Sequence, residues 1–533
     1  MFGGIIHTPS DNPHDENKTF DFPTSIFYLL FRPMNKFFIT TPIYYVNDVP
    51  HIGHAYTTIL ADVLARFHRA AGDEVFFITG VDEHGQKVLQ AAQKRGVSPQ
   101  QHCDELAPRF GNLWEKLNIG NDDFIRTTEV RHTKVVQHVL QKVYDAGDIY
   151  VDEYEGWYSV AEERFITETE MTSGQFRDVK QIKERNYFFK MGKYQERLIK
   201  YIQDNPNFIM PEHRANEILG FLKQPLGDLC ISRPKARMSW GIDLPFDKDY
   251  VTYVWFDALI NYISVPGYSS NDKKFEKWWP ADLHLIGKDI LTTHSVYWTT
   301  MLFSLGLELP KTIFAHGWWL TGDTKMSKSL GNVMNPMDFI EKYGVDAVRY
   351  FLMREMVLGS DANFTEDAFI KRYNSDLAND FGNLLNRVSG LLGKNHGGAV
   401  PTPGSMTPAE EEIVAFGRGL SVKVHGLVAG LKIHEAIDET LNLVRLVNKY
   451  LESQAPWKLA KTDLPSASRV LYVAAEALRL SAVLLKSVMP SKTQTVLDIL
   501  GAGDSGLTWG ELKPGTKLQA HEVLFPRIEI EKK

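Results

Sequence analysis

Hydrophobic and polar positions in the first hundred residues follow a strand–helix–strand pattern. Residues 37–40 form an apolar run typical of a buried strand, and residues 53–71 repeat apolar positions at helical spacing before Gly72. A second apolar run covers residues 75–79. This order predicts a βαβ unit, and therefore a parallel sheet with a right-handed crossover.

The same pattern returns after roughly 100 residues that are rich in charge and aromatic side chains. Residues 251–256 predict a strand that runs into a helix. Residues 284–286 predict another strand, followed by a helix through about residue 305, and residues 312–315 predict a third strand. Two such halves predict an α/β fold, a doubly wound Rossmann-like domain carrying an insertion at about 146–245.

From about residue 370 to residue 500 the chain has helical periodicity and few strand signals. Two apolar stripes at helical spacing are formed by Leu377, Phe381, Leu384, Leu385 and Val388, and by Leu443, Leu446, Val447 and Tyr450. This part predicts an all-α helical bundle.

Composition narrows the class of protein. The chain has 533 residues, 44% hydrophobic and 23% charged, which is ordinary for a soluble protein of two to four domains. Its net charge of −7 excludes a small basic nucleic-acid binder, but not an enzyme with a local basic face. Only Cys103 and Cys230 occur, which excludes a disulfide framework and suits a reducing compartment. No apolar run is long enough to span a membrane, so we expect a cytoplasmic protein.

Residues 1–33 do not fit the helix and strand patterns that follow. They hold one arginine, several acids and a short apolar run without a basic segment before it, so transit and signal peptides both fit poorly. Met34 stands just before the first predicted strand. We interpret this stretch as a dispensable or misassigned extension.

The motif His51-Ile52-Gly53-His54 lies where the first predicted strand gives way to the first helix. In open α/β sheets, ligands bind at the carboxyl ends of strands and at helix N-termini. Two histidines three residues apart face the same way on a helix, and their imidazoles can stabilise charge on a leaving pyrophosphate. Gly53 lets a flat base or a phosphate approach the backbone. A metal pair or two surface histidines are the alternatives.

A second motif, Lys325-Met326-Ser327-Lys328-Ser329, follows the last predicted strand of the α/β domain. Two lysines in a mobile loop can close on a triphosphate, although a lysine pair alone is more often a solvated basic loop. The chain has no Gly-x-x-x-x-Gly-Lys-Ser/Thr loop and no Gly-x-Gly-x-x-Gly after the first strand. These absences argue against a P-loop ATPase and against an NAD-dependent enzyme. Together the two motifs predict that ATP activates a carboxylate.

These motifs resemble the signatures of class I aminoacyl-tRNA synthetases, and the detail resembles the methionyl-tRNA synthetase family from about Met34 onward. The matching stretches are TTPIYYVN (40–47), GVDEHG (80–85), VWFDALINY (254–262), GKDILTTHSVYW (287–298) and AHGW (315–318). The resemblance implies a methionine–tRNA ligase that uses ATP with Mg²⁺, L-methionine and tRNA(Met). It would form methionyl-adenylate and transfer methionine to the 3′-terminal adenosine of the tRNA.

The resemblance also implies the residues of the catalytic domain's sites. His51, His54, Lys325 and Lys328 would be catalytic, and ATP would also contact Gly53, Gly287, Asp289, His316 and Gly317. Methionine is a flexible, polarizable thioether that suits an apolar and aromatic pocket. The expected pocket residues, from three strand ends of one sheet, are Ile43, Tyr45, Trp255, Ala258, Leu259, Tyr262, His294 and Trp298, with Asp82 as the counter-charge for the ammonium group. Any one of these aromatic residues alone is more often a core residue. Asp257 is either support for the site or a helix N-terminal charge.

The resemblance also implies that the helical part of the chain recognises the CAU anticodon of the tRNA. Asn383 and Arg387 stand one turn apart on a predicted helix, and Trp457 offers a stacking surface for an unpaired base. Without the resemblance, a core tryptophan and a helix-surface pair would be the preferred interpretation.

The chain departs from many family members in the inserted domain. Ser159 and Glu162 stand where a Cys-x-x-Cys pair is expected, and a second pair is missing near 174–179. A serine and one carboxylate cannot rebuild a thiolate site, so we predict an insert without zinc and no other metal. No dimerising module follows residues 525–528, so we expect a monomer.

The expected domains follow from the pattern and the resemblance. They are an N-terminal extension (1–34), the first half of the catalytic domain (35–145), an inserted acceptor-end domain (146–245), the second half of the catalytic domain (246–318), a signature-loop and stem-contact region (319–369) and the anticodon-binding bundle (370–533). The alternatives are a class I synthetase for leucine, isoleucine, valine or cysteine, and a non-catalytic RNA-binding relative. The chain has little room for an editing insertion and lacks active-site zinc thiolates, and both signature motifs are present.

Overall fold

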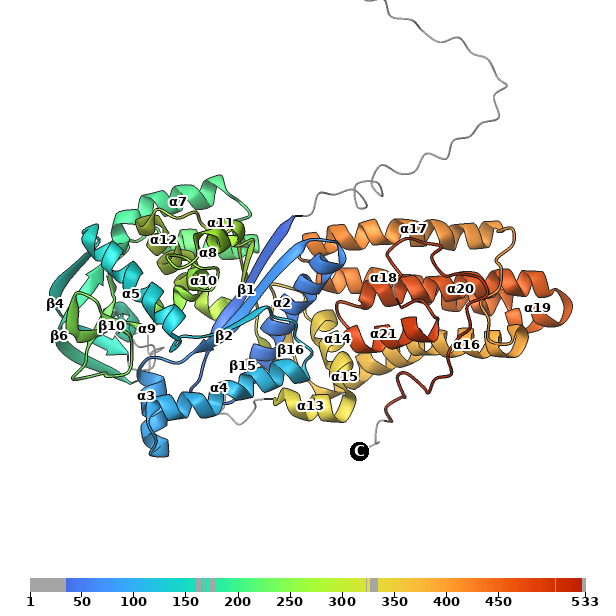
Figure 1. The fold of residues 1–533 in the computed structure, drawn as a ribbon, viewed down its shortest axis with the longest axis horizontal. Helices are drawn as coiled ribbons and strands as arrows, with labels where there is room; N and C mark the ends of the chain where they lie inside the picture. Colours follow the sequence, from blue (N-terminus) through green and yellow to red (C-terminus); the bar gives the residue numbers. More distant parts are fainter. Residues whose placement is uncertain are drawn as a thin grey trace, which may run out of the picture.

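The structure is a computed structural model in which residues 35–159, 164–166, 168–172, 178–322, 324–325, 334–503 and 505–529 are described. It has two lobes, an α/β lobe and an elongated helical bundle, and α2 (Ile52–Ala70) lies where they meet (Figure 1). The expected N-terminal extension lies outside the described residues.

A six-stranded parallel sheet forms the centre of the α/β lobe. Its strand order is β3-β2-β1-β12-β13-β7. The strands are β1 (Lys36–Tyr45), β2 (Glu74–Asp82), β3 (Asp123–Arg126), β7 (Ile209–Met210), β12 (Leu283–Gly287) and β13 (Thr312–His316). The two halves of the domain meet between β1 and β12, which pair in parallel. The predicted doubly wound Rossmann-like fold is therefore confirmed.

Helix α2 forms for the reasons that the sequence suggested. It links β1 to β2, and its apolar side Ile59, Leu60, Val63 and Leu64 is buried. The chain then turns at Gly72, whose φ of +85° favours glycine. Five further helices of this lobe are α3 (Gln86–Arg95), α4 (Pro99–Lys116), α5 (Val130–Asp145), α11 (Asp272–Trp278) and α12 (Thr299–Leu305). A π-helical segment, Thr293–Trp298, precedes α12.

The expected strand over residues 251–256 is wrong in extent and in partner. The strand is β11 (Asp247–Thr252), and it pairs antiparallel with β9 (Ser232–Pro234) and β10 (Asp243–Leu244) in a separate sheet. Helix α9 (Val254–Leu259) already includes Trp255, and α10 (Asn261–Ser264) follows it. The aromatic and β-branched residues favour a strand locally. Tertiary contacts override that preference, because the buried Asp257 carboxylate is bonded by two histidines from elsewhere in the chain.

The expected insertion at 146–245 contains a second sheet and a return to the first. The second sheet has the order β5-β4-β6-β8, built from β4 (Ile149–Ser159), β5 (Arg164–Ile166), β6 (Val179–Phe189) and β8 (Leu229–Cys230), with α6 (Glu168–Thr172) beside β5 in the sequence. Helices α7 (Gln195–Asp204) and α8 (Glu212–Phe221) flank β7, the edge strand of the central sheet. The domain limits stay a prediction.

A connecting region joins the lobes. It consists of β14 (Trp319–Thr321), β15 (Thr324–Lys325), α13 (Pro336–Tyr343), α14 (Val345–Glu355), β16 (Ala362–Asn363) and α15 (Glu366–Arg372). Helix α14 packs against α2 on one side and against α18 and α21 of the bundle on the other.

The predicted helical bundle is confirmed. A π-helical segment, Tyr373–Gly382, leads into α16 (Asn383–His396), α17 (Pro408–Ala429), α18 (Ile433–Gln454), α19 (Pro456–Thr462), α20 (Leu464–Leu485) and α21 (Pro490–Ile499). The first predicted stripe, from Leu377 to Val388, is fully buried. The core of the bundle continues into the connecting region and onto the outer face of α2.

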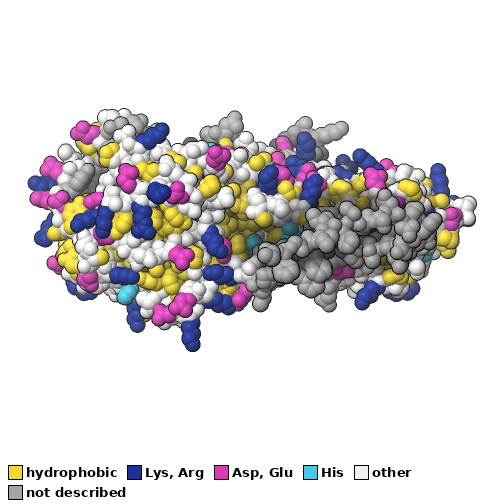
Figure 2. All heavy atoms as spheres, turned by 90° about the horizontal axis from the view of Figure 1, so that it is seen from above, with side chains coloured by type: hydrophobic (Ala, Val, Ile, Leu, Met, Phe, Trp, Pro, Cys, Tyr) yellow, Lys and Arg dark blue, Asp and Glu magenta, His cyan; other side chains and the backbone are white. Residues whose placement is uncertain are grey.

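Figure 2 shows Lys, Arg, Asp and Glu side chains scattered over one face of both lobes rather than gathered in one patch of a single sign. Among the helices in the described part of the chain, none is long and apolar enough to cross a membrane.

Candidate active site

The two histidines of the first motif form the N-terminus of α2. His51 is the N-cap, with extended backbone, and its Nδ1 accepts a hydrogen bond from the backbone N–H of Gly53 at 3.1 Å. The His54 Nδ1 accepts from the backbone N–H of His51 at 3.2 Å, which completes a capping box. The two rings stack with centroids 3.8 Å apart.

This arrangement decides which nitrogen of each histidine can act. A ring nitrogen that accepts a backbone N–H carries no proton, so in this geometry the proton of each imidazole is on Nε2. Both Nε2–H groups are therefore donors at a helix N-terminus, where the helix dipole also favours an anion. The pair is suited to bind phosphate oxygens as neutral donors.

The His54 ring is held by aromatic neighbours. Tyr44 lies 4.7 Å and Phe110 5.7 Å from it, centroid to centroid. The Tyr44 hydroxyl is bonded to Thr58 Oγ1 at 2.8 Å, and burial raises the pKa of Tyr44 to about 12. Tyr44 is thus a neutral, fixed support beneath the motif.

The strand end at β13 is tied to α2 by one hydrogen bond. His316 Nε2 and Thr57 Oγ1 are 2.7 Å apart, and His316 Nδ1 lies 2.8 Å from the carbonyl of Gly317. Because only a protonated nitrogen can bond a carbonyl, Nδ1 is the donor and Nε2 accepts from Thr57. Burial lowers the pKa of His316, which keeps it neutral. Packing requires glycine at position 317, since a Cβ there would stand 2.0 Å from the carbonyl oxygen of Ser360.

Asp289 lies in the turn after β12, beside the tryptophan that follows Gly317. Its Oδ1 accepts from Trp318 Nε1 at 3.2 Å. Lys288 Nζ lies 4.1 Å from the centre of the Trp318 ring and bonds the Asp361 carboxylate at 2.7 Å. Asp361 also accepts from the backbone N–H of Trp318 at 2.8 Å. The three loops after β12, β13 and α14 are therefore linked at the carboxyl edge of the central sheet.

The second motif is described in part. The backbone of Lys325 belongs to β15 and pairs with Leu320 of β14, so the motif begins directly beside the strand that follows the β13 loop. Lys328 and the loop around it lie outside the described residues.

The expected methionine-binding residues gather around β1, α9 and the segment after β12. Trp255 lies 6.3 Å from Tyr45 and 6.3 Å from His294, ring centre to ring centre. Ile43, Tyr45 and Trp255 are partly exposed, whereas the others are almost fully buried, namely Ala258, Leu259, Tyr262, His294 and Trp298. The three partly exposed residues are accessible from solvent, and the five buried ones pack behind them in the core.

The expectation that these residues come from three strand ends of one sheet is wrong. Tyr45 is at the end of β1, but Trp255, Ala258 and Leu259 lie on α9, which follows the separate antiparallel sheet. His294 and Trp298 lie in the π-helical segment after β12. Of these eight residues, Ile43 and Tyr45 belong to a strand of the central sheet and the other six do not.

Two sets of hydrogen bonds, which meet where the Tyr262 and His284 rings stack, fix the orientation of the buried aromatic residues. His294 Nδ1 bonds the carbonyl of Ile290, so its Nε2 accepts from the Tyr262 hydroxyl at 2.8 Å. His284 accepts from Trp298 Nε1 at 3.2 Å and bonds Thr40 Oγ1 at 2.8 Å. Burial lowers the pKa of His294 to about 4 and that of His284 well below its usual value. Both imidazoles are therefore uncharged at neutral pH.

Asp82 ends β2 next to the end of β1. Its backbone pairs in register with that of Tyr45, so the carboxylate and the phenol ring stand on neighbouring strand ends. Asp82 is only 3% exposed and its Oδ1 accepts the backbone N–H of His84 at 3.4 Å. A buried carboxylate at this place can act as a counter-charge for an ammonium group.

Asp257 is fully buried in the first turn of α9, so it is both an acidic residue near a helix N-terminus and an anchor for that helix. Its two oxygens bond His84 Nδ1 at 2.6 Å and His132 Nε2 at 2.8 Å, and His132 Nδ1 lies 2.9 Å from Ser264 Oγ. The histidines hold the pKa of the Asp257 carboxyl below its usual value despite burial, which alone would raise it. The network holds α9, and with it Trp255, against β2 and α5.

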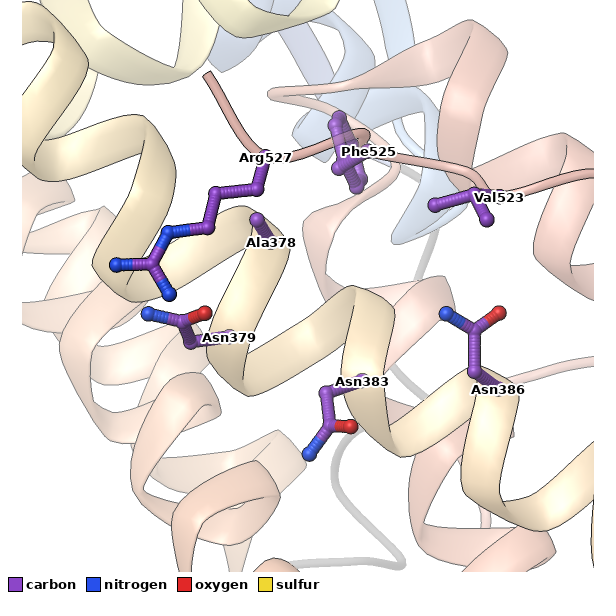
Figure 3. Close-up of a pocket in the computed structure, with 7 residues that line it drawn as sticks. All are labelled: Ala378, Asn379, Asn383, Asn386, Val523, Phe525 and Arg527. Carbon is purple, nitrogen blue, oxygen red and sulfur yellow. The ribbon is translucent and has the colours of Figure 1, made fainter. Parts of the chain in front are cut away.

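The three residues expected at the anticodon lie on one part of the bundle, but they face two ways. The Arg387 guanidinium lies 5.9 Å from the centre of the Trp457 ring and donates a hydrogen bond to Asn448 Oδ1 at 3.4 Å. Trp457 is 41% exposed. Asn383 faces a cavity of about 360 Å³ between α16 and the C-terminal segment (Figure 3). The cavity is lined by Ala378, Asn379, Asn383, Asn386, Val523, Phe525 and Arg527.

The positions where zinc ligands were expected in related chains are partly described. Ser159 is fully buried at the end of β4, whereas Glu162 lies outside the described residues, as do residues 174–177. Within the described ranges, no three or more His, Cys, Asp or Glu side chains gather in a way that could hold a metal ion. Cys103 and Cys230 are both buried and unpaired with each other.

Sequence reasoning missed several residues of the site. Thr57, His284 and Trp318 connect residues that had been predicted. His284 had a usable signal, because a histidine inside an apolar strand must find buried partners. Trp318 ends the AHGW stretch (315–318) that carries the resemblance, but its bonds to Asp289 and Asp361 could not be predicted from it. Thr57 had no signal, because its partner His316 is 259 residues away.

Comparison with known proteins agrees with this geometry. Residues 37–175 and 171–389 match the family of class I tRNA synthetases (M), and residues 400–533 match the anticodon binding domain of methionyl tRNA ligase. The chain is 44% identical over 508 residues to a methionine–tRNA ligase of Caldanaerobacter subterraneus subsp. tengcongensis, covering 93% of this chain and 79% of the relative. It is 46% identical over 514 residues to that of Clostridium tetani, covering 94% and 80%. A solved structure of Mycobacterium tuberculosis methionyl-tRNA synthetase with methionyl-adenylate superposes with a TM-score of 0.89 at 40% identity, covering 93% of this chain and all of that one.

Proposed function

Since the chain belongs to the methionyl-tRNA synthetases, the methionine–tRNA ligases of class I, we propose on that premise how its own residues perform the reaction. The reaction joins L-methionine to tRNA(Met) at the expense of ATP, by way of methionyl-adenylate. Within it, one methionine carboxylate oxygen attacks the α-phosphorus of ATP, and pyrophosphate leaves. A hydroxyl of the tRNA's 3′-terminal adenosine, the 2′-hydroxyl in our proposal, then attacks the activated carbonyl, and AMP leaves.

In the first step, His51 and His54 stabilise the charge that develops on the phosphates. Their Nε2–H groups are the donors, because the capping box makes both Nδ1 atoms acceptors. Such pre-oriented donors need little reorganisation as charge develops. ATP enters as its Mg²⁺ complex, and Lys325 and Lys328 close on it from the loop after β14. Gly53, Gly287, Asp289, His316 and Gly317 line the adenosine side.

Methionine lies against the partly exposed residues of the pocket. Ile43, Tyr45 and Trp255 contact the side chain, and Asp82 pairs with the ammonium group. Ala258, Leu259, Tyr262, His294 and Trp298 hold the pocket's shape and keep it free of charge, which suits an apolar thioether. The support for this proposal is that aromatic residues from three segments converge beside Asp82.

The bundle reads the anticodon through Asn383, Arg387 and Trp457. The exposed indole offers a stacking surface, and the guanidinium beside it offers donors to base edges. We further propose a catalytic domain in two halves (35–145 and 246–318), an acceptor-end insert (146–245) that needs no zinc, a stem-contact region (319–369), an anticodon domain (370–533), and a monomeric, cytoplasmic enzyme.

The observation that carries the proposal is the stacked, capped pair of His51 and His54 at the N-terminus of α2, where His54 lies against Tyr44 near the end of β1. A non-catalytic RNA-binding relative is the competing function, and Lys328→Ala separates the two. The variant should lose methionine-dependent pyrophosphate exchange and keep tRNA binding, because Lys328 acts on the triphosphate. Unchanged charging of tRNA(Met) by this variant would contradict the proposed role of the loop.

A further inference from the structure

One arginine at the junction of the two lobes is fully buried and bonded to three separate segments. Arg349 lies on α14 and none of its side chain is exposed. Arginine is rarely buried in full unless all its donors are used, because an unpaired buried guanidinium is costly. The groups that accept hydrogen bonds from Arg349 therefore indicate its role.

The bonds of Arg349 reach both lobes. On the α/β side, Nη2 donates to Asp62 Oδ2 of α2 at 2.6 Å, and Nη1 donates to the carbonyl of Leu117 at 2.9 Å. On the bundle side, Nε donates to the carbonyl of Val488 at 2.9 Å and Nη2 to that of Ser487 at 3.0 Å. Ser487 and Val488 form the turn between α20 and α21.

Asp62 is as buried as Arg349 and is fixed from several sides. Its Oδ1 accepts the backbone N–H of Gly120 at 2.7 Å, and its Oδ2 also accepts from Arg66 at 2.7 Å. The carboxylate therefore cannot turn without breaking bonds to three groups. Any displacement of the α20–α21 turn must move Arg349, and through Asp62 it must move α2.

Both ends of this connection are functional in the proposed enzyme. Asp62 stands eight residues after His54 on the same helix, ~12 Å along its axis. In the other direction, α20 is a single buried helix of 22 residues, ~33 Å long. Helix α19, which carries Trp457, packs against α20. Rigid elements thus lead from the Trp457 region to Arg349 and from Arg349 to the histidine pair.

We propose that Arg349 is a positioning residue that couples an occupied anticodon face to the placement of the catalytic histidines of α2. This inference rests on the proposed function, and it adds a residue that touches no substrate. Anticodon binding would then raise the rate of transfer to tRNA in addition to holding the tRNA. Coupling of this kind in proteins amounts to about 5- to 150-fold in an equilibrium constant.

Arg349→Lys tests the coupling while retaining the charge. The lysine ammonium can still pair with Asp62, but it cannot also reach the carbonyls of Ser487 and Val488, because it lacks the guanidinium's planar fork. The matched control is Arg479→Lys. Arg479 is equally buried and bonds Glu476 and the carbonyls of Gly506 and Thr508, all of which lie within the bundle.

Three reactions separate coupling from a structural role. These are methionine-dependent pyrophosphate exchange, charging of full tRNA(Met), and charging of an acceptor-stem minihelix that lacks the anticodon. We expect Arg349→Lys to lower kcat for the full tRNA about tenfold with KM unchanged, while exchange and minihelix charging stay near those of the unsubstituted enzyme. The Arg479→Lys control should leave all three near their original values.

Other results would overturn the inference. If all three reactions fall together, Arg349 only maintains the fold. If KM for the full tRNA rises while kcat stays unchanged, Arg349 acts on tRNA binding. If neither parameter changes, Arg349 does not couple the two sites. If the unsubstituted enzyme shows no methionine-dependent pyrophosphate exchange, the proposed function itself is contradicted.

Should the variant fail to fold, hydrogen exchange on the unsubstituted enzyme decides the matter. An anticodon stem-loop RNA, which cannot reach the active site, should slow amide exchange in α2 between His54 and Asp62. Unchanged exchange there with the bundle demonstrably occupied would refute the coupling.

Discussion

His51 has two separable tasks in this structure, and two substitutions can distinguish them. Its Nδ1 caps α2 by accepting the Gly53 N–H, and we assign its Nε2–H to the phosphates of ATP. Asparagine is a good N-cap, whose side-chain oxygen can replace Nδ1 as an acceptor. It places no donor where Nε2 stands. Alanine supplies neither function.

The expected magnitudes differ for the two tasks. Replacing a capping side chain by alanine costs about 1 kcal/mol, which for a domain of this size lowers Tm by about 2 °C. Removing one pre-oriented donor from developing charge lowers kcat by about 10² to 10³. His51→Asn should therefore be as stable as the unsubstituted enzyme, whereas His51→Ala should be less stable. Both should lose exchange activity to a similar extent.

The assay is methionine-dependent pyrophosphate exchange at saturating substrates, with thermal unfolding of the same samples. If His51→Asn keeps exchange within about threefold, the imidazole Nε2 does not act on the phosphates as we infer. If His51→Ala unfolds at the same temperature as His51→Asn, the capping role is wrong.

Four further outcomes follow from the site. Asp82→Asn should raise KM for methionine about 10- to 100-fold in the exchange assay, with KM for ATP unchanged, because a charge-assisted bond contributes about 1.5 to 3 kcal/mol. Burial lowers the pKa of His294 to about 4. Stability should therefore fall as the pH drops from about 6.5 through 4, where the unfolded chain takes up a proton first. His294→Gln should flatten that decline in urea unfolding measured across this range, and an unchanged slope would contradict the assignment. Trp457→Ala should raise KM for tRNA about 5- to 100-fold through lost stacking and leave exchange unaltered. Metal analysis of the purified enzyme should find less than stoichiometric zinc, and activity lost to a chelator should return with Mg²⁺ alone.

Local patterns could predict four of the six strands of the central sheet, because β1, β2, β12 and β13 are short apolar runs, whereas β3 and the two-residue β7 were not predicted. Residues 37–40, 75–79 and 312–315 were identified from pattern, and each lies in the parallel sheet. The chain order of strand, helix and strand then restricted the topology to a few choices.

The segment around Trp255 could not be predicted in the same way. Its aromatic and β-branched residues favour a strand by propensity, yet α9 forms there. The deciding contacts are those of Asp257 with His84 and His132, which come from 173 and 125 residues away. No local pattern contains such partners.

The candidate site was predictable in its residue types but not in its internal bonds. His51 and His54 could be expected on one face of a helix, but the use of both Nδ1 atoms as caps depends on backbone geometry. Arg349 carried no sequence signal at all, because an arginine on an amphipathic helix is usually solvated. Its partners at Asp62, Ser487 and Val488 become neighbours only when both lobes are assembled.

Pyrophosphate exchange with each of the twenty amino acids in turn is the most direct test of the central claim. It measures adenylate formation at the site of His51, His54 and the aromatic pocket, and it does not require tRNA. We predict exchange with methionine well above that with every other amino acid, including leucine, isoleucine, valine and cysteine. Folded enzyme that shows no methionine-dependent exchange, or that prefers another amino acid, would contradict the account.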